Sequence, residues 1–156
     1  MRAVVQRVGA ARVEIDGAVV GSIERGLLVY LGVGKGDGDT ERAWMLDKIL
    51  GLRIFQNEAG KMDKSVLDVG GALLVVSQFT LYGDVRRGRR PSFDGAMPPA
   101  DAEAAYERFV REARERVGVE TGRFGADMRV FSENEGPVTI WLDTAKPESP
   151  TPPFGV

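Results

Sequence analysis

The chain has 156 residues and a net charge of -2; 43% of the residues are hydrophobic and 28% are charged. This length and composition suit a single globular domain, and the slightly negative charge argues against a protein that coats nucleic acid with its whole surface. The sequence contains no histidine and no cysteine, which excludes a Ser–His–Asp triad, an HExxH zinc site, a thiol nucleophile and a thiolate metal site.

Neither a signal peptide nor a membrane span is expected from the sequence. Arg2 and Arg7 interrupt the N-terminal segment, and the longest apolar run, residues 27–31, is far too short to cross a membrane. We therefore expect a soluble, cytoplasmic protein. No cluster of metal-ligating residues stands out, so neither a metal nor a cofactor is expected.

The first third of the chain predicts strands and a hairpin. Residues 3–8 and 10–15 are rich in β-branched side chains, which is typical of short strands. The Asp-Gly pair at 16–17 is a turn signal, so residues 18–23 should return as the second strand of a hairpin. The continuous apolar run at 27–33 predicts a strand that is buried on both faces.

A glycine-rich loop at residues 34–39 follows this strand, an order that invites comparison with a phosphate-binding loop. The comparison fails because Lys35 is followed by glycine instead of serine or threonine, and the leading glycine of the motif would fall on Val29. The segment therefore predicts a mobile surface loop.

Two helices are expected. The first starts at about residue 39 or 40 and ends at Gly51, with apolar side chains recurring on one face. The second follows the proline pair at 98–99, carries an apolar stripe from Ala102 to Val117 and ends at Gly118.

The remaining elements are predicted from apolar runs and turn residues. They are a short strand at 53–55, an irregular stretch at 61–69, a highly apolar strand at 72–79, a long loop at 82–98 and two closing strands at 128–131 and 138–142. The fold class is therefore α+β: one compact domain over residues 1–144, with a mostly antiparallel sheet or open barrel and two main helices. Residues 145–156 form a proline-rich tail that is expected to be disordered.

The end of the predicted strand at 72–79 is unusually polar. If the strand alternation continues, Ser77, Phe79 and Leu81 share one face and Gln78 and Thr80 share the other. Such polar groups cost roughly 1–3 kcal/mol each when they are buried without partners. They therefore either complete a turn or offer backbone N–H groups and a hydroxyl to a ligand.

Two other segments leave a similar choice between structure and function. The Gly136-Pro137 pair between the closing strands is expected to be trans on frequency alone, since about 5–6% of X-Pro bonds are cis. Arg86, Arg87, Arg89 and Arg90 crowd four guanidinium groups into one loop, which is easier to explain if phosphates bind there, although a solvated loop is equally compatible. Phe93 either stacks on a base or anchors the loop.

Together these segments resemble the D-aminoacyl-tRNA deacylase family, of the D-tyrosyl-tRNA deacylase type. The matching motifs are SQFTL at 77–81, RRPSF at 89–93, TGRF at 121–124 and NEGPVT at 134–139, supported by VVQRV at 4–8 and RIF at 53–55. The resemblance extends from residue 1 to about residue 143. The proline-rich tail departs from it.

The resemblance implies a homodimer that hydrolyses the ester of D-aminoacyl-tRNA, and of glycyl-tRNA, in translation quality control. It implies that Gly136-Pro137 is cis and reaches the partner's site to reject L-amino acids, with Arg7 as support. Ser77, Gln78, Phe79 and Thr80 would form the catalytic segment, with backbone N–H groups of Gln78, Phe79 or Thr80 as an oxyanion hole. Positioning or hydrogen bonding is the favoured role for Thr80; as a nucleophile it would need Lys, Asp or Glu as its base.

Two alternatives remain open at this point. One is a non-catalytic RNA-binding dimer that uses the arginine loop. The other is a hydrolase of small D-amino acid esters with no RNA partner.

Overall fold

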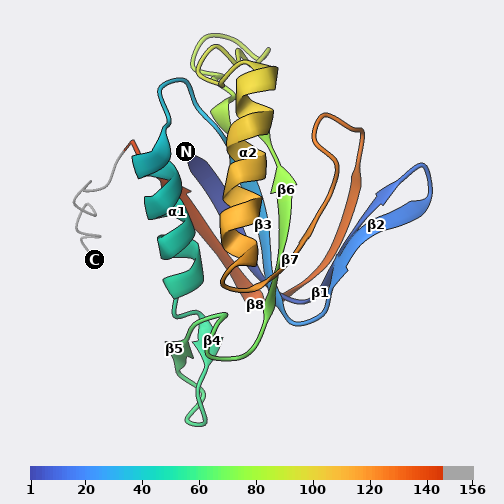
Figure 1. Cartoon of the computed structure of the whole chain (residues 1–156), viewed down its shortest axis with the longest axis vertical. Helices are drawn as coiled ribbons and strands as arrows, with labels where there is room; N and C mark the ends of the chain where they lie inside the picture. Colours follow the sequence, from blue (N-terminus) through green and yellow to red (C-terminus); the bar gives the residue numbers. More distant parts are fainter. Residues whose placement is uncertain (146–156) are drawn as a thin grey trace.

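A strongly curved sheet carries both main helices on one of its faces (Figure 1). The computed structural model describes residues 1–145. The sheet contains strands β1 (Arg2–Ile15), β2 (Ala18–Ile23), β3 (Gly26–Gly32), β6 (Ala72–Ser77), β7 (Gly118–Thr121) and β8 (Arg129–Asp143). The remaining elements are helices α1 (Asp39–Gly51) and α2 (Pro99–Arg114), the short 3-10 helix η1 (Phe79–Tyr82), and a separate small hairpin of β4 (Phe55–Gln56) and β5 (Met62–Lys64). The predicted α+β class with two main helices is confirmed.

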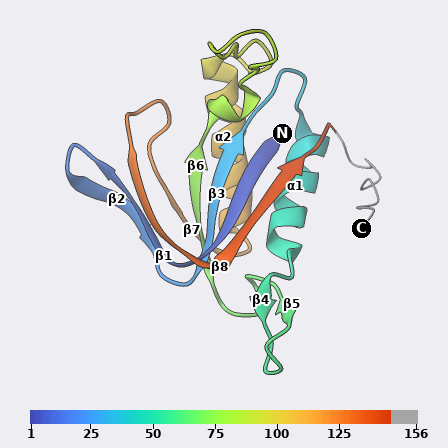
Figure 2. The ribbon, with the colours of Figure 1, turned by 180° about the vertical axis from the view of Figure 1, so that it is seen from behind.

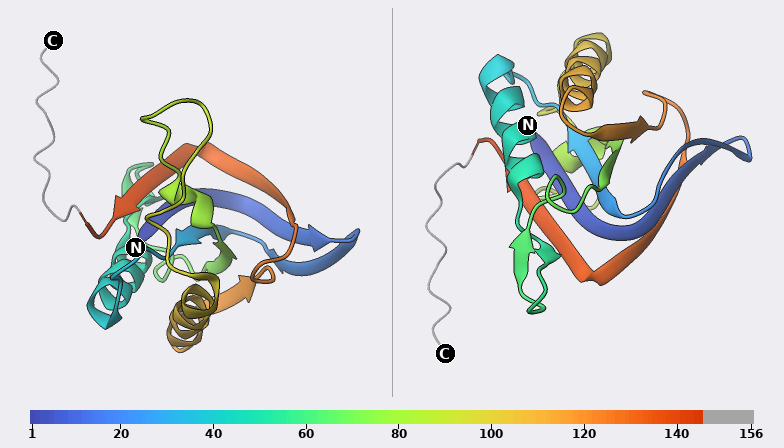
Figure 3. Two further views of the ribbon diagram at one scale, coloured as in Figure 1. Left: turned by 90° about the horizontal axis from the view of Figure 1, so that it is seen from above. Right: turned by 60° about the horizontal axis from the view of Figure 1, so that its bottom comes forward.

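Strand β1 organises the sheet. It has 14 residues, and it bends so that its first half pairs with β3 and its second half pairs with β2, while β8 runs antiparallel beside both halves. On the other side of β3, β6 and then β7 are added in parallel. Figure 3 shows how this bend rolls the sheet into an open barrel.

The barrel is nearly closed where β2 approaches β7. A Cβ atom on Gly21 would lie 2.2 Å from the carbonyl oxygen of Thr121, so only a residue without a side chain lets the two strands come this close. No strand pairing links β2 to β7 in the described part of the chain. The result is a mixed sheet in which the strands next to β1 are antiparallel and those beyond β3 are parallel.

The main core lies between the sheet and the two helices. Val5 and Val29 are register partners on the helix-facing side, and Met45, Ile49 and Phe109 from the helices pack in the same cluster. All five side chains are fully buried. A second, smaller core, which includes Val13, Leu28 and Leu74, fills the inside of the curved half of the sheet. These two cores hold the end of β6 rigidly in place.

The end of β6 differs from the prediction. The strand stops at Ser77 instead of residue 79, and the next residues form the η1 turn. The N–H of Gln78 donates the last ladder bond, to the carbonyl oxygen of Leu31 at 2.8 Å. Its neighbour β3 ends at Gly32, so no strand remains for the chain to pair with. The predicted alternation of Phe79 and Leu81 against Thr80 is therefore wrong.

Other boundaries also differ from those expected. Helix α2 ends at Arg114, and Gly118 does not end the helix but opens β7, which the sequence analysis missed because a four-residue strand has too little pattern to recognise. The predicted strand pairs at 3–8 and 10–15, and at 128–131 and 138–142, are each one long strand, because β1 and β8 support each other across the irregular register near Val8. Apart from Ala145, the predicted disordered tail lies outside the described residues. Within residues 1–145, no helix is long and apolar enough to cross a membrane.

Phe109 offers a test of the main core. We predict that Phe109→Ala lowers the free energy of unfolding by about 3–5 kcal/mol, because it removes a fully buried aromatic ring and leaves a cavity. Arg108→Ala, on the exposed face of the same helix, should change it by less than about 0.5 kcal/mol. Urea denaturation of both variants makes the comparison. Equal changes in the free energy of unfolding for the two variants would mean that Phe109 does not pack in the main core.

Candidate active site

A pocket opens at the end of β6, between η1, the first half of α2 and the segment that leads into β8. Its volume is about 690 Å³. Its walls are mainly apolar, and they include Leu31, Val76, Phe79, Phe93, Met97, Tyr106, Phe124 and Met128, with Ser77, Gln78, Lys35 and Asp94 as polar members. The structure therefore brings four of the predicted site residues, Ser77, Gln78, Phe79 and Phe93, to one cavity.

The η1 turn presents free backbone donors beside this pocket. The N–H of Gln78 is already bound to Leu31, and the N–H of Leu81 donates to the carbonyl oxygen of Gln78 at 3.3 Å. The N–H groups of Phe79 and Thr80 have no acceptor among the described residues. The first N–H groups of a helical turn lack partners within the turn, which makes them available to a ligand. The predicted oxyanion hole is thus reduced to Phe79 and Thr80.

Thr80 lies on the exposed side of η1. Its hydroxyl oxygen accepts a short hydrogen bond from the side-chain amide of Gln78, and Thr80 does not line the pocket of its own chain. Among residues 1–145, no carboxylate is hydrogen-bonded to this hydroxyl. This arrangement suits a hydroxyl that is oriented for hydrogen bonding.

Phe79 and Phe93 connect η1 to the long loop. Their rings pack edge to face with centroids 5.0 Å apart, and the side chain of Phe79 is still 58% exposed. Two hydrogen bonds between Asp84 and Ser92 close the base of the loop. Phe93 is therefore part of the pocket wall, and an additional planar group could stack against this pair.

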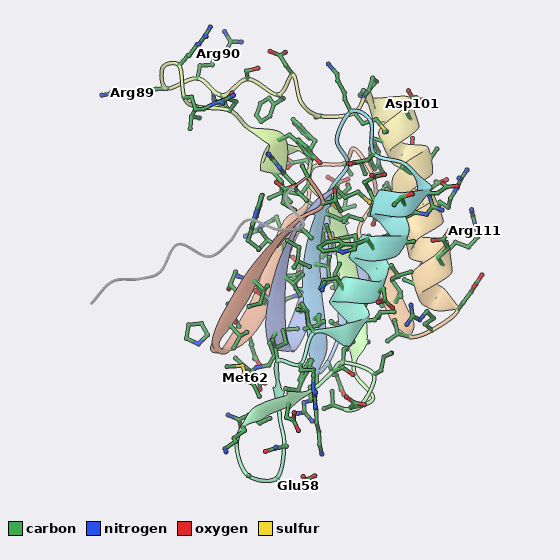
Figure 4. All side chains as sticks on the ribbon, turned by 90° about the vertical axis from the view of Figure 1, so that its left-hand side faces the viewer. Glu58, Met62, Arg89, Arg90, Asp101 and Arg111 are labelled. Carbon is green, nitrogen blue, oxygen red and sulfur yellow. The ribbon has the colours of Figure 1, made fainter. Side chains whose placement is uncertain are left out.

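The four arginines of the loop do not share one role in the structure. Arg86 turns back onto Asp84, and these hydrogen bonds lower the pKa of the Asp84 carboxyl to about 2. Arg87, Arg89 and Arg90 are exposed and belong to none of the ion pairs within residues 1–145. Figure 4 shows Arg89 and Arg90 at the tip of the loop, pointing away from the body of the protein.

Gly136 and Pro137 lie on an exposed bend of β8, and their peptide bond is cis, as the resemblance implied. Gly136 has a φ of 125°, a conformation that other residues rarely adopt. Asn134 closes the bend, because its side-chain oxygen accepts a hydrogen bond from the N–H of Val138 at 3.0 Å. This hydrogen bond links the two ends of the bend.

Arg7 supports this bend from beneath. Its side chain is buried, and it donates to the carbonyl oxygen of Ile54 at 2.6 Å and to that of Glu135 at 3.2 Å. A Cβ atom on Gly136 would lie 2.9 Å from the Arg7 guanidinium. A buried guanidinium must bond to acceptors, so these two carbonyls fix the position of Arg7 and Arg7 fixes the bend.

The two motifs do not meet within one chain. Arg2, at the start of β1, contacts η1 through the carbonyl oxygen of Leu81, whereas Arg7, five residues later, contacts the bend next to Gly136. Five residues of strand span about 17 Å. Neither Gly136 nor Pro137 lines the pocket. A single chain therefore presents the pocket and the bend as separate surfaces.

Several site residues escaped the sequence analysis. Tyr106 reaches the pocket from α2, and its hydroxyl donates to the carbonyl oxygen of Val75 at 2.8 Å. Burial raises the pKa of Tyr106 to about 12, so it stays protonated at neutral pH. Its helical spacing had indicated only a core position. Lys35 and Met128 come from segments without a periodic pattern, and no sequence signal could have placed them at the pocket. No group of three or more Asp and Glu in residues 1–145 is arranged to hold a metal ion.

Comparison with known proteins identifies the class of protein. The family model described as D-Tyr-tRNA(Tyr) deacylase matches residues 4–143. A D-aminoacyl-tRNA deacylase of Sorangium cellulosum is 59% identical over 148 residues, covering 94% of this chain and 99% of that protein. One from Kosmotoga olearia is 58% identical over 146 residues, with the same coverage.

Two solved structures share this fold. A structure described as c-Myc DNA Unwinding Element Binding Protein superposes with a TM-score of 0.89 at 43% identity, covering 92% of this chain and 99% of that one. A probable eukaryotic D-amino acid tRNA deacylase has a TM-score of 0.76 at 20% identity, which supports the fold alone. The chain belongs to the D-Tyr-tRNA(Tyr) deacylase family. The family and the enzyme class expected from the sequence, a hydrolase that acts on aminoacyl-tRNA, are confirmed.

Proposed function

We propose that this chain hydrolyses the ester that joins a D-amino acid, or glycine, to the terminal adenosine of tRNA, and that it spares L-aminoacyl-tRNA. The observation that carries this proposal is the apolar pocket lined by Phe79, next to a turn in which the N–H groups of Phe79 and Thr80 have no acceptor. The pocket suits the adenosine, and the two N–H groups suit the oxygen of the ester carbonyl. The released products are the free amino acid and intact tRNA.

The proposed reaction needs little acid–base machinery because an aminoacyl ester is already activated. Water adds to the ester carbonyl and negative charge develops on the carbonyl oxygen. The bond between the carbonyl carbon and the ribose oxygen then breaks, and the ribose oxygen leaves with the proton that the water gives up. Donors aimed at that oxygen can contribute about 10²–10³ in rate each. Water or the neighbouring ribose hydroxyl supplies the proton transfers, since Tyr106 remains protonated and the chain has no histidine.

We propose that a homodimer completes each site in the cytoplasm. The separation of the η1 turn from the Gly136–Pro137 bend in one chain supports this, because a second copy can bring its bend to the first copy's pocket. An apolar patch on the helix-free face of the sheet supports it as well: Val4 is the register partner of both Tyr30 and Trp141, and Trp141 is 51% exposed. Figure 2 shows this side of the sheet uncovered by helices.

In the proposed dimer, the bend acts as a filter for handedness. The carbonyl oxygens of Gly136 and Pro137 would accept hydrogen bonds from the substrate's α-ammonium group. They would occupy the direction in which an L side chain must project, so that only hydrogen or a D side chain fits. Such a filter reads the Cα atom, which explains how one site could accept D-amino acids of many sizes and glycine.

Matched D- and L-charged tRNA provides the direct test. We expect the purified protein to deacylate D-tyrosyl-tRNA and glycyl-tRNA while leaving L-tyrosyl-tRNA intact. Release of radiolabelled amino acid measures all three rates. Salt-sensitive tRNA binding without deacylation would instead support an RNA-binding module. Equal rates on free D-tyrosine esters would remove the role of tRNA.

Thr80→Ala separates a positioning role from a nucleophilic one. We expect kcat to fall by no more than about tenfold, because a positioning hydrogen bond contributes about 0.5–1.5 kcal/mol. Loss of a covalent nucleophile would cost on the order of 10⁶. Single-turnover deacylation measures the difference, with Thr80→Ser as the variant that keeps the hydroxyl. Complete loss in a folded, tRNA-binding Thr80→Ala protein would contradict the positioning role.

Gly136→Ala tests the filter. The added methyl group would press on Arg7 at 2.9 Å, and the residue would have to leave its φ of 125°. We expect the ratio of D-tyrosyl- to L-tyrosyl-tRNA deacylation to fall by at least tenfold. Gly60→Ala is the control, because Gly60 also has a positive φ, of 75°, but lies on the β4–β5 hairpin with open space around it. An unchanged ratio in Gly136→Ala would refute the filter.

The arginine loop is proposed to bind phosphates of the tRNA acceptor end through Arg87, Arg89 and Arg90, with Arg86 holding the loop. We predict that Arg89→Ala with Arg90→Ala weakens D- and L-charged tRNA equally. The slope of log Kd against log salt should fall by about one for each arginine removed. Arg111→Ala, an exposed arginine on α2 (Figure 4), should leave the slope unchanged. A slope that stays the same in the loop variant would exclude direct phosphate contacts.

A further inference from the structure

The η1 turn is also held in place by side chains that lie outside the motifs at 77–81 and 134–139. Arg2 donates one hydrogen bond to the carbonyl oxygen of Leu81 at 3.0 Å, and its guanidinium lies 4.5 Å from the centroid of the Tyr82 ring. Both Leu81 and Tyr82 belong to η1, the turn that carries the free N–H groups of Phe79 and Thr80. Arg2 thus contacts the last two residues of the turn, which follow the residues with free N–H groups.

Arg2 is itself held in place, so it can transmit rigidity. Its Nε donates to the carboxylate of Asp143 at 3.1 Å, and its backbone is fixed in β1 between Gly32 of β3 and Asp143 of β8. A planar guanidinium can bond in several directions at once, whereas an ammonium is a single point of charge. This geometry connects the rigid sheet to a turn that has no strand partner of its own.

A second anchor acts on the same turn through Tyr82. Its hydroxyl donates to Asp37 at 3.2 Å, and the same carboxylate accepts hydrogen bonds from the N–H of Gly34 at 2.6 Å and from the amino group of Met1 at 2.6 Å. Burial and the neighbouring carboxylate of Asp37 raise the pKa of Tyr82, so its hydroxyl stays a donor. The loop at 34–39, expected from the sequence to be mobile, is therefore tied to η1.

We propose that Arg2 is a positioning residue for the reaction: by holding Leu81 and Tyr82, it fixes the N–H groups of Phe79 and Thr80 where the ester oxygen develops charge. This inference rests on the proposed function. Arg2 lines no part of the pocket in its own chain, so removing it should slow the chemical step without weakening the binding of tRNA. Charge stabilisation in a site depends on donors that are held in place before the reaction starts.

The test compares Arg2→Met with Arg12→Met. Arg12 lies on the same strand, with Glu14 as its carboxylate partner at 2.8 Å and the Phe131 ring at 4.1 Å, and it has no contact with η1. Arg2 differs from it in lying near a second ring as well, that of Trp141 at 5.8 Å. We expect the single-turnover rate constant on D-tyrosyl-tRNA to fall about tenfold in Arg2→Met, with Kd for tRNA unchanged, and to stay at the wild-type value in Arg12→Met. Arg2→Lys, which keeps the charge, should recover part of the loss.

Hydrogen exchange supplies a readout that does not depend on activity. Amide exchange of Leu81 and Gly83, whose N–H groups are hydrogen-bonded to Gln78 and Thr80, should accelerate in Arg2→Met and remain unchanged in Arg12→Met, since of these two arginines only Arg2 is bonded to the turn. Unchanged exchange, or an unchanged rate constant beside an active wild-type protein, would overturn the role of Arg2. A wild-type protein that is inactive on D-tyrosyl-tRNA would overturn the proposed function, and with it the catalytic role of Arg2.

Discussion

Strand β1 is the constraint on which the rest of the structure depends. It is a continuous strand of 14 residues that is paired along both edges, and this pairing fixes the distance between its two ends. Arg2 at its start is bonded to η1, and Arg7 in its middle is bonded to the bend beside Gly136. The strand therefore holds the two segments with site-like chemistry at a fixed separation. Neither Gly136 nor Pro137 lines the pocket, so the two segments remain separate surfaces within one chain.

The chemistry proposed for the pocket is that of fixed dipoles. Four features favour such chemistry in a chain without histidine: a strand that ends when its neighbour ends, a helical turn that leaves two N–H groups free, an apolar cavity beside that turn, and two arginines, the partly buried Arg2 and the buried Arg7, that hold the turn and the bend. Each of these lowers the reorganisation needed when charge develops on an ester oxygen. An activated ester is a substrate for which such modest assistance suffices.

Electrostatics divides the arginines into two kinds. Arg2, Arg7 and Arg86 each bond to a carbonyl or carboxylate of the protein itself and serve to hold a segment in place. Arg89 and Arg90 extend from the loop tip and are free for a polyanion (Figure 4). The local concentration of positive charge thus exists at one edge of a molecule whose net charge is -2. The net charge of the whole chain does not reveal this local positive charge.

The sequence by itself determined the elements with long or regular patterns. The apolar runs of β3 and β6 and the stripe of α2 indicated their own burial, and the absence of histidine and cysteine limited the chemistry to backbone dipoles, carboxylates, hydroxyls and amines. The motifs at 77–81 and 134–139 indicated the family because their residue order is specific. A local sequence pattern does not show which strand will pair with which.

The tertiary structure decided everything that depends on that neighbour. β6 ends at Ser77 because β3 ends at Gly32, and only then do Phe79 and Thr80 acquire free N–H groups. β7 exists because β6 offers it an edge, and Arg7 acts on Gly136 because β8 passes beside β1. Local propensity fixes which residues can form a strand or a turn, whereas pairing and packing across the sheet fix where each one stops and which side chains and amides are left for function.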